Sequence, residues 1–324
     1  MPTSTATEHR RRAVVAIGGN AITAESEQGT YQEMLANCQA LARPCALMVA
    51  AGWQLILVHG NGPQVGNLEL QQMASYPNTP EQPLHALDAM TQGLVGHLLH
   101  RGLSPGAVAA DSPITTILTH VMVQHEDPAF DNPTKPIGPF YGREQADRLR
   151  EQHGWSMVDD AQRGWRRIVP SPRPRHIVEL SAIKGLVDAG FTVICGGGGG
   201  IPVTSSEKMT GVEAVIDKDR TAALLASSLG ADALVLVTAV ESVVLNFGTP
   251  QARALHDVSS AEMTRFHQDG HFPAGSMGPK VESAIDFAEA SEGTATITST
   301  AGLPQALEAG ATVGTRISRP KEAS

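Results

Sequence analysis

The chain has 324 residues, of which 41% are hydrophobic and 18% are charged, enough apolar material for one large or two ordinary globular domains. Its formal net charge of −9 disfavours a general nucleic-acid surface, so any phosphate site must be local. The apolar runs are far shorter than the ~20 residues that cross a bilayer, and we expect no membrane span.

The two ends of the chain and its thiols favour a cytoplasmic protein. Residues 1–12 carry three arginines but lead straight into a strand without an apolar signal core, so they are expected to be a solvated tail, with a short transit peptide as the alternative. Residues 318–324 form the second tail. Cys38, Cys45 and Cys195 lack metal-ligand spacing and fit reduced thiols better than a disulfide framework.

Short strand-like runs alternate with helix-length segments along the chain. Their content of Val, Ile, Leu and Thr predicts strands at 13–17, 54–58, 114–122, 191–195, 233–238 and 295–298. Apolar spacing predicts helices at 31–51, with a kink or break at Pro44, and at 88–101, 176–189, 218–229 and 277–291. Near-continuous apolar strands between helices predict an α/β protein with a mainly parallel sheet covered on both faces.

Residues 124–174 break this alternation. The segment is rich in proline and charge and contains two of the three tryptophans. It is too long for an ordinary loop, so we expect a lid-like insertion or a small subdomain near the site.

Four glycine-bearing motifs each follow a strand or open a helix. They are AIGGNA at 16–21, HGNGPQVG at 59–66, GGGGGIPV at 196–203 and GSMGPK at 275–280. Glycines let backbone N–H groups approach an anion, and a following helix adds its positive dipole end. Any one loop could be only a tight turn, but together they favour one polyanion site at the carboxyl ends of the strands.

Phosphate chemistry also needs positive charge. Lys218 opens a helix between Asp217 and Asp219, Lys280 closes GSMGPK, and Lys135 lies between two prolines of the inserted segment. Three lysines on rigid supports could neutralise a transferring phosphoryl group. Alternatively, the lysines are solvated surface residues and one aspartate only caps its helix.

The sequence lacks the motifs of several other classes of enzyme. There is no Walker A motif, and the five glycines run into Ile-Pro rather than into a helix, as a dinucleotide fingerprint would, which disfavours a nicotinamide or flavin enzyme. Ser276 does not fit a nucleophile elbow, and the histidines, His59 included, show no paired metal pattern.

The ordered motifs AIGGNA, LVHGNGPQVGN, DPAFDNPTKPIGPFY, GWRRIVPSPRP, GGGGIPV, GVEAVIDKD, NFGTPQ and GSMGPKVESAI closely resemble those of carbamate kinases, within the amino acid kinase superfamily. The resemblance runs from about residue 14 to residue 316. It implies a three-layer αβα sandwich with a central, mainly parallel sheet, formed by a single domain at 13–317. It also implies that 124–174 is a protruding lid-like subdomain and that the protein is a homodimer.

The resemblance further implies reversible phosphoryl transfer between ATP and carbamate, giving ADP and carbamoyl phosphate, with Mg²⁺ carried by the nucleotide rather than fixed by the protein alone. The residues that it implies for catalysis are Lys218, Lys280, Lys135, Asp219 and Asp217. Those that it implies for carbamate and the phosphoryl group are Gly18, Gly19, Asn20, Gly60, Asn61 and Gly62. Those that it implies for the nucleotide are Gly198, Gly199, Thr238, Ala239, Val244, Met277 and Gly278.

One segment departs from the family pattern. Where carbamate kinases read close to LTDVDGVYINFG, residues 237–248 read VTAVESVVLNFG, with Ala239, Ser242 and Val244 in place of Asp, Gly and Tyr. We therefore expect an intact phosphate site beside an altered adenosine pocket, in a divergent carbamate kinase-like enzyme. The alternatives are a kinase of a related small carboxylate and a non-catalytic module that binds a nucleotide or a phosphorylated metabolite.

Overall fold

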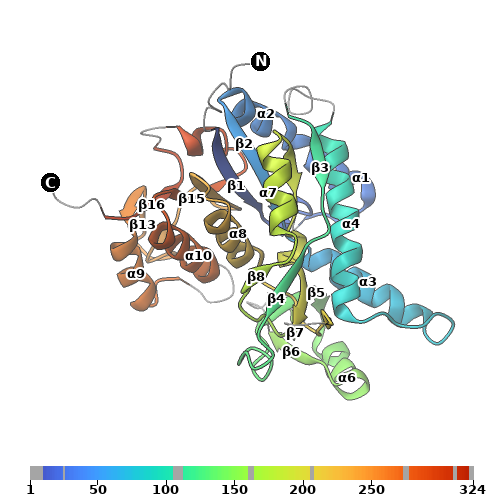
Figure 1. Ribbon diagram of the computed structural model, residues 1–324. Helices are drawn as coiled ribbons and strands as arrows, with labels where there is room; N and C mark the ends of the chain where they lie inside the picture. Colours follow the sequence, from blue (N-terminus) through green and yellow to red (C-terminus); the bar gives the residue numbers. More distant parts are fainter. Residues whose placement is uncertain are drawn as a thin grey trace, which may run out of the picture.

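A central eight-stranded sheet organises the fold (Figure 1). The computed structural model describes residues 10–24, 26–104, 112–159, 164–204, 208–272, 277–308 and 312–320. In spatial order the strands are β14 (Asp257–Ser259), β16 (Thr315–Ser318), β15 (Thr294–Ser299), β11 (Ala233–Thr238), β1 (Arg11–Ile17), β2 (Trp53–His59), β9 (Thr192–Ile194) and β3 (Ile114–Thr116). Neighbours are parallel except for β15 and β16. The mainly parallel sheet predicted from the sequence is therefore confirmed.

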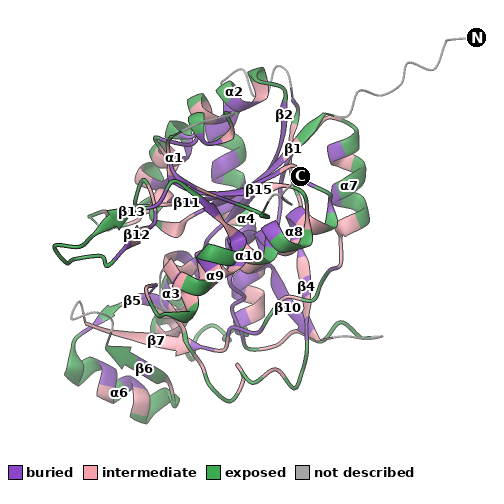
Figure 2. Ribbon diagram, turned by 90° about the vertical axis from the view of Figure 1, so that its left-hand side faces the viewer, coloured by how far each residue is buried: buried purple, intermediate pink, exposed green. Residues whose placement is uncertain are grey.

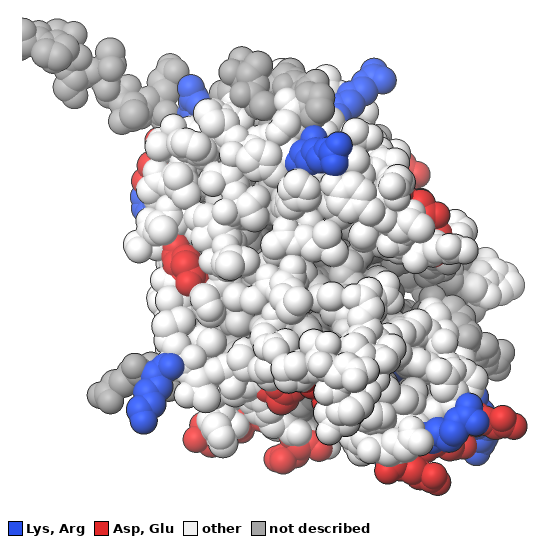
Figure 3. All heavy atoms as spheres, turned by 90° about the vertical axis from the view of Figure 1, so that its right-hand side faces the viewer, with Lys and Arg blue, Asp and Glu red and all other residues white. Residues whose placement is uncertain are grey.

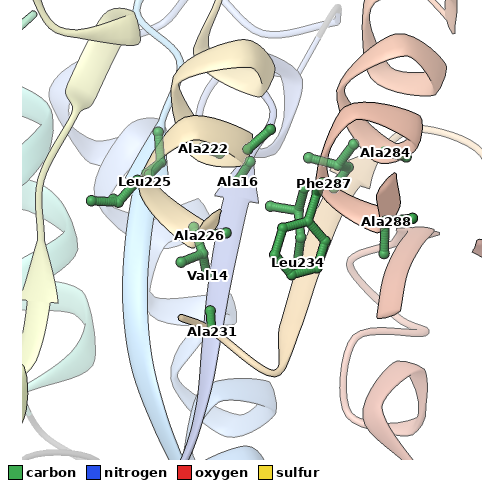
Figure 4. Close-up of a cluster of buried hydrophobic side chains, with 14 of the residues drawn as sticks. Val14, Ala16, Ala222, Leu225, Ala226, Ala231, Leu234, Ala284, Phe287 and Ala288 are labelled. Atoms are coloured by element: carbon green, nitrogen blue, oxygen red, sulfur yellow. The ribbon is translucent and has the colours of Figure 1, made fainter. Parts of the chain in front are cut away.

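The central strand β1 is buried on both faces, because successive side chains of a strand point to opposite sides. Val14 and Ala16 join one hydrophobic cluster, whereas Ala13, Val15 and Ile17 join another on the opposite face. Figure 4 shows the first cluster, in which Val14 and Ala16 lie among side chains of two helices and the neighbouring strand β11. This double burial accounts for the near-continuous apolar runs in the sequence.

Helices cover both faces of the sheet and complete a three-layer αβα sandwich. One layer contains α1 (Tyr31–Ala40), α2 (Ala42–Ala50) and α4 (Leu84–Leu103). The other contains α7 (Leu180–Asp188), α8 (Lys218–Ser228), α9 (Ser260–Gln268) and α10 (Met277–Ala290). Figure 2 shows the buried residues concentrated in the sheet and on the inward sides of these helices. No helix in the described part of the chain combines the length and apolarity that a bilayer crossing requires.

A smaller antiparallel sheet lies beyond the main one, within the inserted segment (Figure 1). Its strands are β5 (Lys135–Tyr141), β7 (Trp165–Val169) and β6 (Ser156–Asp159), with helix α6 (Arg143–His153) between β5 and β6. It meets the main body at α3 (Gly62–Ser75), where a Cβ on Gly66 would lie 1.9 Å from Cα of Gly138. Only glycine fits this contact. The boundaries 124–174, and 13–317 for the whole domain, remain predictions.

The remaining strands form two further small sheets. The first has the order β10 (Ile201–Thr204), β4 (His120–Val123) and β8 (His176–Ile177), and the second pairs β12 (Val244–Leu245) with β13 (Arg253–Ala254). The strand predicted at 114–122 is thus two strands in different sheets. The side chain of Gln92 explains the break, because it hydrogen-bonds both the carbonyl oxygen and the N–H of Thr119, at 3.0 and 2.9 Å.

Two predicted helices also begin or break elsewhere than expected. The helix predicted at 31–51 divides at Leu41, and Pro44 lies in the first turn of α2, where backbone N–H groups need no helical partner. Of the helix predicted at 176–189, the first two residues form β8 and the helix begins at Leu180.

The five consecutive glycines form a close-packed turn after β9, not a linker. Gly196, Gly198, Gly199 and Gly200 have positive φ angles. A Cβ on Gly199 would lie 2.3 Å from the carbonyl oxygen of Ile216, and one on Gly200 would lie 2.2 Å from a methyl carbon of Val121. The run is therefore dictated by both backbone conformation and packing.

Gly199→Ala is expected to lower the free energy of unfolding by roughly 3 kcal/mol, because a left-handed backbone strain of about 1–2 kcal/mol adds to an overpacking cost of about 1–3 kcal/mol. Gly52→Ala is the matched control, since Gly52 has a similar φ of +86° but no atom within 4 Å of the added Cβ. Urea denaturation of both variants measures the difference. Equal losses would show that packing around Gly199 contributes nothing.

Candidate active site

A cavity of about 370 Å³ lies at the carboxyl ends of β1, β2 and β11. This is where the strands of an open parallel sheet present their following loops. Its described lining residues are Gly18, Gly19, Asn20, Ala21, Gly60, Asn61, Gly62, Pro63, Lys135, Pro136, Arg166, Gly198, Ile216, Asp217, Lys218, Asp219, Val237, Thr238, Ala239, Pro279, Lys280 and Thr300.

Three helices begin at the cavity wall. Helix α3 begins at Gly62 and α8 at Lys218, and both residues line the cavity, while α10 contributes Pro279 and Lys280 from its first turn. The glycine loops after β1 and β2 touch, since a Cβ on Gly60 would lie 3.1 Å from the backbone nitrogen of Gly19. Free N–H groups and positive dipole ends at helix N-termini favour a bound anion.

Asp219 bridges two lysines across the cavity wall. Its Oδ1 accepts a hydrogen bond from Lys218 Nζ and its Oδ2 accepts one from Lys280 Nζ, both at 2.9 Å. Asp219 is 1% exposed and Lys218 is 9% exposed. The carboxylate thereby holds two ammonium groups side by side on the N-termini of α8 and α10.

Asp217 has a different set of partners. It caps α8, because its Oδ1 accepts a 2.9 Å hydrogen bond from the backbone N–H of Asp219, and its Oδ2 is paired with Lys135 Nζ. Lys135 is the first residue of β5 in the inserted antiparallel sheet. The ion pair therefore joins that sheet to the main body at the cavity.

Burial and charge oppose each other in this cluster. Burial alone would raise the pKa of Asp219, but Lys218 and Lys280 outweigh it and the pKa is lowered. Likewise, Lys135 and Lys218 outweigh burial and lower the pKa of Asp217. Burial lowers the pKa of Lys218 despite the neighbouring Asp219, whereas for Lys280 the attraction of Asp219 outweighs burial and raises the pKa. Both carboxylates are thus ionised near neutral pH.

The charged side chains leave the cavity with excess positive charge. Among the described lining residues, three lysines and Arg166 face two aspartates. Arg166 comes from β7, and its Nε donates a 3.1 Å hydrogen bond to the carbonyl oxygen of Gly138. Preorganised cations and helix N-termini in a partly enclosed site stabilise the charge that develops during phosphoryl transfer.

A buried polar network supports the wall on the β2 side. Asn61 Nδ2 donates to Asp88 Oδ1 and to Thr91 Oγ1, each at 2.9 Å, and both partners belong to α4. Asp88 is fully buried, and its burial raises the pKa well above the ordinary value although the bond from Asn61 acts in the other direction. Asp88 is therefore harder to ionise than an exposed aspartate.

Comparison with known proteins identifies the family. The model of the amino acid kinase family matches residues 11–299. The chain belongs to the amino acid kinase family. It is 43% identical to a carbamate kinase of Pyrococcus furiosus over 86% of this chain and 90% of the relative, and 44% identical to one of Trichomonas vaginalis over 92% and 96%.

Solved structures agree with the family assignment. Carbamate kinase from Giardia lamblia bound to AMP-PNP superposes with a TM-score of 0.87 at 39% identity, covering 96% of this chain and 99% of the other. The same enzyme bound to citric acid gives a TM-score of 0.90 at 40% identity, with the same coverage. An N-acetylglutamate synthase from Neisseria gonorrhoeae, at 19% identity and a TM-score of 0.58, shares the fold.

Most of the residues predicted from the sequence of this amino acid kinase line the same cavity. They are Lys218, Lys280, Lys135, Asp219, Asp217, Gly18, Gly19, Asn20, Gly60, Asn61, Gly62, Gly198, Thr238 and Ala239. Four predicted nucleotide residues, Gly199, Val244, Met277 and Gly278, are not among its described lining residues. Met277 packs against the hydrophobic core, and Val244 of β12 pairs with Ala254 of β13. Ser276 lies outside the described residues.

The prediction missed Arg166 and Thr300 among the polar lining residues. Thr300 directly follows β15, so the rule that ligands lie beyond the carboxyl ends of strands could have indicated it. Arg166 lies in the GWRRIVPSPRP motif, but its sequence does not reveal that β7 lies at the cavity.

His59, the last residue of β2, is held neutral beside the glycine run. A Cβ on Gly197 would lie 2.3 Å from His59 Nε2, and His59 Nδ1 lies 3.1 Å from the carbonyl oxygen of Gly60, to which it donates. Burial lowers the pKa of His59 from 6.5 to about 4, although the bond to Gly60 acts in the other direction.

This pKa predicts a loss of stability in acid. Between pH 6.5 and about 4 the unfolded chain binds a proton at His59 that the folded chain does not. The contribution of His59 to the free energy of unfolding is therefore fully present above pH 6.5 and is lost as the pH falls toward 4. We expect His59 to contribute up to about 3 kcal/mol to this fall. Urea denaturation across this range should show a shallower fall for His59→Gln, and parallel curves would contradict the assignment.

Proposed function

We propose that the chain is a carbamate kinase, which transfers a phosphoryl group reversibly between ATP and carbamate. The proposed direction is the formation of ATP and carbamate from ADP and carbamoyl phosphate. The observation that carries the proposal is the pair of lysines bridged by Asp219 at the meeting point of two helix N-termini. The named carbamate kinases with 43–44% identity over most of the chain support the same reaction.

The cavity residues are proposed to form two neighbouring substrate positions. The loops after β1 and β2, with Gly18, Gly19, Asn20, Gly60, Asn61 and Gly62, are proposed to hold carbamate and the moving phosphoryl group. The wall after β11, with Thr238 and Ala239, is proposed to hold the nucleotide, together with Gly198. Because β1 lies between β11 and β2, the two substrates would meet above the end of β1.

The lysines and the aspartates would do the electrostatic work of transfer. Lys218 and Lys280 would neutralise the phosphoryl oxygens as the P–O bond to one substrate breaks and the bond to the other forms. Asp219 would keep the two ammonium groups in place, and Lys135 would add a third cation from the inserted sheet. Asp217 would orient both Lys135 and the start of α8.

Mg²⁺ is proposed to enter with the nucleotide. Mg²⁺ in kinases is usually bound by one or two carboxylates together with substrate phosphates. Asp217 and Asp219 are ionised carboxylates at the cavity wall and fit this pattern, although each is also engaged by lysine. Within the described ranges no group of three or more His, Cys, Asp or Glu side chains is placed to hold a metal. The ion would supply further positive charge at the phosphates.

The comparisons do not favour the two alternatives. The named relatives over most of the chain are carbamate kinases, not kinases of another small carboxylate. A module that only binds a ligand would have no need for two lysines held by one buried carboxylate. The altered segment bears on nucleotide preference rather than on transfer, because Ala239 lines the cavity whereas Ser242 and Val244 are not among its described lining residues.

Lys218→Ala should reduce ATP formation from carbamoyl phosphate and ADP by at least ~10²-fold, the scale of removing one transition-state charge donor. The measurement is a coupled assay of ATP with Mg²⁺, repeated with other nucleoside diphosphates. Lys184→Ala is the control, because Lys184 pairs with Asp188 and its side chain is 53% exposed. A wild-type protein with a confirmed fold but no activity with any nucleoside diphosphate would refute the function.

We also propose a homodimer formed through α4 and the edge strand β3. The face on which α4 lies in Figure 1 carries few charged side chains, and these lie mainly at its rim (Figure 3). Met90 and Leu118 are 51% and 49% exposed. Strand β3 has a neighbour on one side only among the described strands, and such an edge can be covered by a second copy.

Changing both Met90 and Leu118 to Glu should produce monomers, because burying two carboxylates at an apolar interface is costly. Sedimentation velocity measures the mass of the particle. Phe247→Glu, at a residue that is 78% exposed in the turn between β12 and β13, should leave the mass unchanged. A wild-type monomer, or a double variant that remains a dimer, would exclude this interface.

A cytoplasmic location is proposed from the thiols. Cys38, Cys45 and Cys195 are all free and buried, and burial raises the pKa of each to about 12. Thiols of this kind suit a reducing compartment.

A further inference from the structure

The side chain of Asn61 has a fixed orientation at the cavity wall. Asn61 is 2% exposed and directly precedes α3 at the end of β2. Its Nδ2 carries two hydrogens, and both are used by Asp88 Oδ1 and Thr91 Oγ1. Both N–H groups of the amide are therefore used by hydrogen bonds to α4.

The bond made by Thr91 determines which end of the amide points inward. The hydroxyl of Thr91 donates its one hydrogen to the main-chain oxygen of Asp88, at 2.8 Å. It can therefore only accept a hydrogen bond from Asn61, and a reversed amide would place oxygen against oxygen. Gly198 limits the movement of the side chain further, because a Cβ there would lie 2.2 Å from Asn61 Nδ2.

The Oδ1 of Asn61 is consequently the polar atom that this side chain has free. Within the described residues no donor reaches Oδ1, and Asn61 lines the cavity. The other side chains on this part of the wall are mostly donors. The oxygens of Asp217 and Asp219 already accept bonds from lysines or from the start of α8.

A carbamoyl group has one part that such donors cannot bind. Its carboxyl oxygens suit lysines and backbone N–H groups, but its amino group needs a hydrogen-bond acceptor. We propose that Asn61 Oδ1 accepts an N–H of this amino group, and that Asp88 and Thr91 are positioning residues that hold the oxygen toward the substrate. This rests on the proposed carbamate kinase activity and extends it to the choice of substrate. No covalent bond to nitrogen changes, and only the phosphoryl group moves.

The proposal makes Asn61 the group that distinguishes carbamoyl phosphate from acetyl phosphate. The two have nearly the same shape, but a methyl group replaces the amino group and offers Oδ1 no hydrogen. A buried acceptor left without its donor disfavours the analogue that lacks it. Asn20 also lines the cavity, but it is exposed and no described contact fixes its amide.

The experiment compares the two phosphates as donors to ADP by kcat/KM, and also measures acetyl phosphate as a competitive inhibitor, so that a wild type unable to turn it over still yields a value. Asn61→Leu should reduce the preference for carbamoyl phosphate about tenfold, the effect of one hydrogen bond. Asn20→Leu should retain the preference, whatever it does to the absolute rates.

Two changes at Asp88 separate positioning from packing. Asp88→Leu removes the acceptor for Asn61 Nδ2 and should reduce the preference at least threefold, a fraction of one hydrogen bond. Asp88→Asn retains an oxygen at Oδ1, and its amide nitrogen would replace Oδ2, which is buried without a partner. This variant should keep the preference within about twofold, since its amide oxygen can still accept the hydrogen bond from Asn61 Nδ2.

Gln54→Leu is the stability control. Gln54 is 8% exposed, donates one 2.8 Å bond to the carbonyl oxygen of Val187, and lies near the opposite end of β2. Its loss should lower stability without changing the preference. If Asn61→Leu is inactive with both phosphates, the difference in preference between Asp88→Leu and Asp88→Asn tests the role of Asn61 instead.

The outcomes separate this inference from the proposed function. A wild type that makes no ATP from carbamoyl phosphate refutes the function. An active wild type whose preference is unchanged in Asn61→Leu and Asp88→Leu, or is lost in Asn20→Leu instead, overturns the role of Asn61 and leaves the function intact.

Discussion

The contact between Asp219 and two lysines is the constraint on which the site depends. Lys218 is buried and Lys280 is partly buried, so their two ammonium groups would repel each other, and leaving the buried one without a counter-charge would cost several kcal/mol. Asp219 offers one oxygen to each, and it is itself almost fully buried. Because Lys218 begins α8 and Lys280 lies in the first turn of α10, the bridge also fixes how the two helix N-termini meet.

The parallel sheet places this bridge where it can act. Strands β11, β1 and β2 are neighbours, so their carboxyl ends and following loops open on the same cavity. The inserted antiparallel sheet approaches from outside through Lys135 and Arg166, and the contact between Gly66 and Gly138 brings it close to α3. Cations from separate parts of the chain thus meet around two carboxylates, in an arrangement suited to a transferring phosphoryl group.

The glycine run and α4 hold the remaining wall in place. The glycines leave room for His59, Asn61, Ile216 and Val121, whose atoms would each collide with an added Cβ. Helix α4 supplies Asp88 and Thr91 to the amide of Asn61 and Gln92 to the turn at Thr119. The run therefore acts mainly through packing inside the protein, and only Gly198 of the five is among the described residues that line the cavity.

The sequence by itself determined the α/β class, the parallel sheet and the family, because apolar strands and glycine loops are patterns of residues that are neighbours in the chain. It also indicated Lys218, Lys280 and Lys135, since a lysine beside a helix start or between prolines is visible in the chain.

Only the tertiary structure decided that Asp219 joins two of these lysines, that the third pairs with Asp217, and that Arg166 and Thr300 reach the cavity. It also decided that Val244 and Met277 are not among the described residues of the wall, and that the amide nitrogen of Asn61 bonds Asp88 and Thr91. These outcomes depend on contacts between residues that lie far apart in the chain, such as Lys135 and Asp217, which are 82 positions apart, and no local pattern encodes which side chains meet across such a distance.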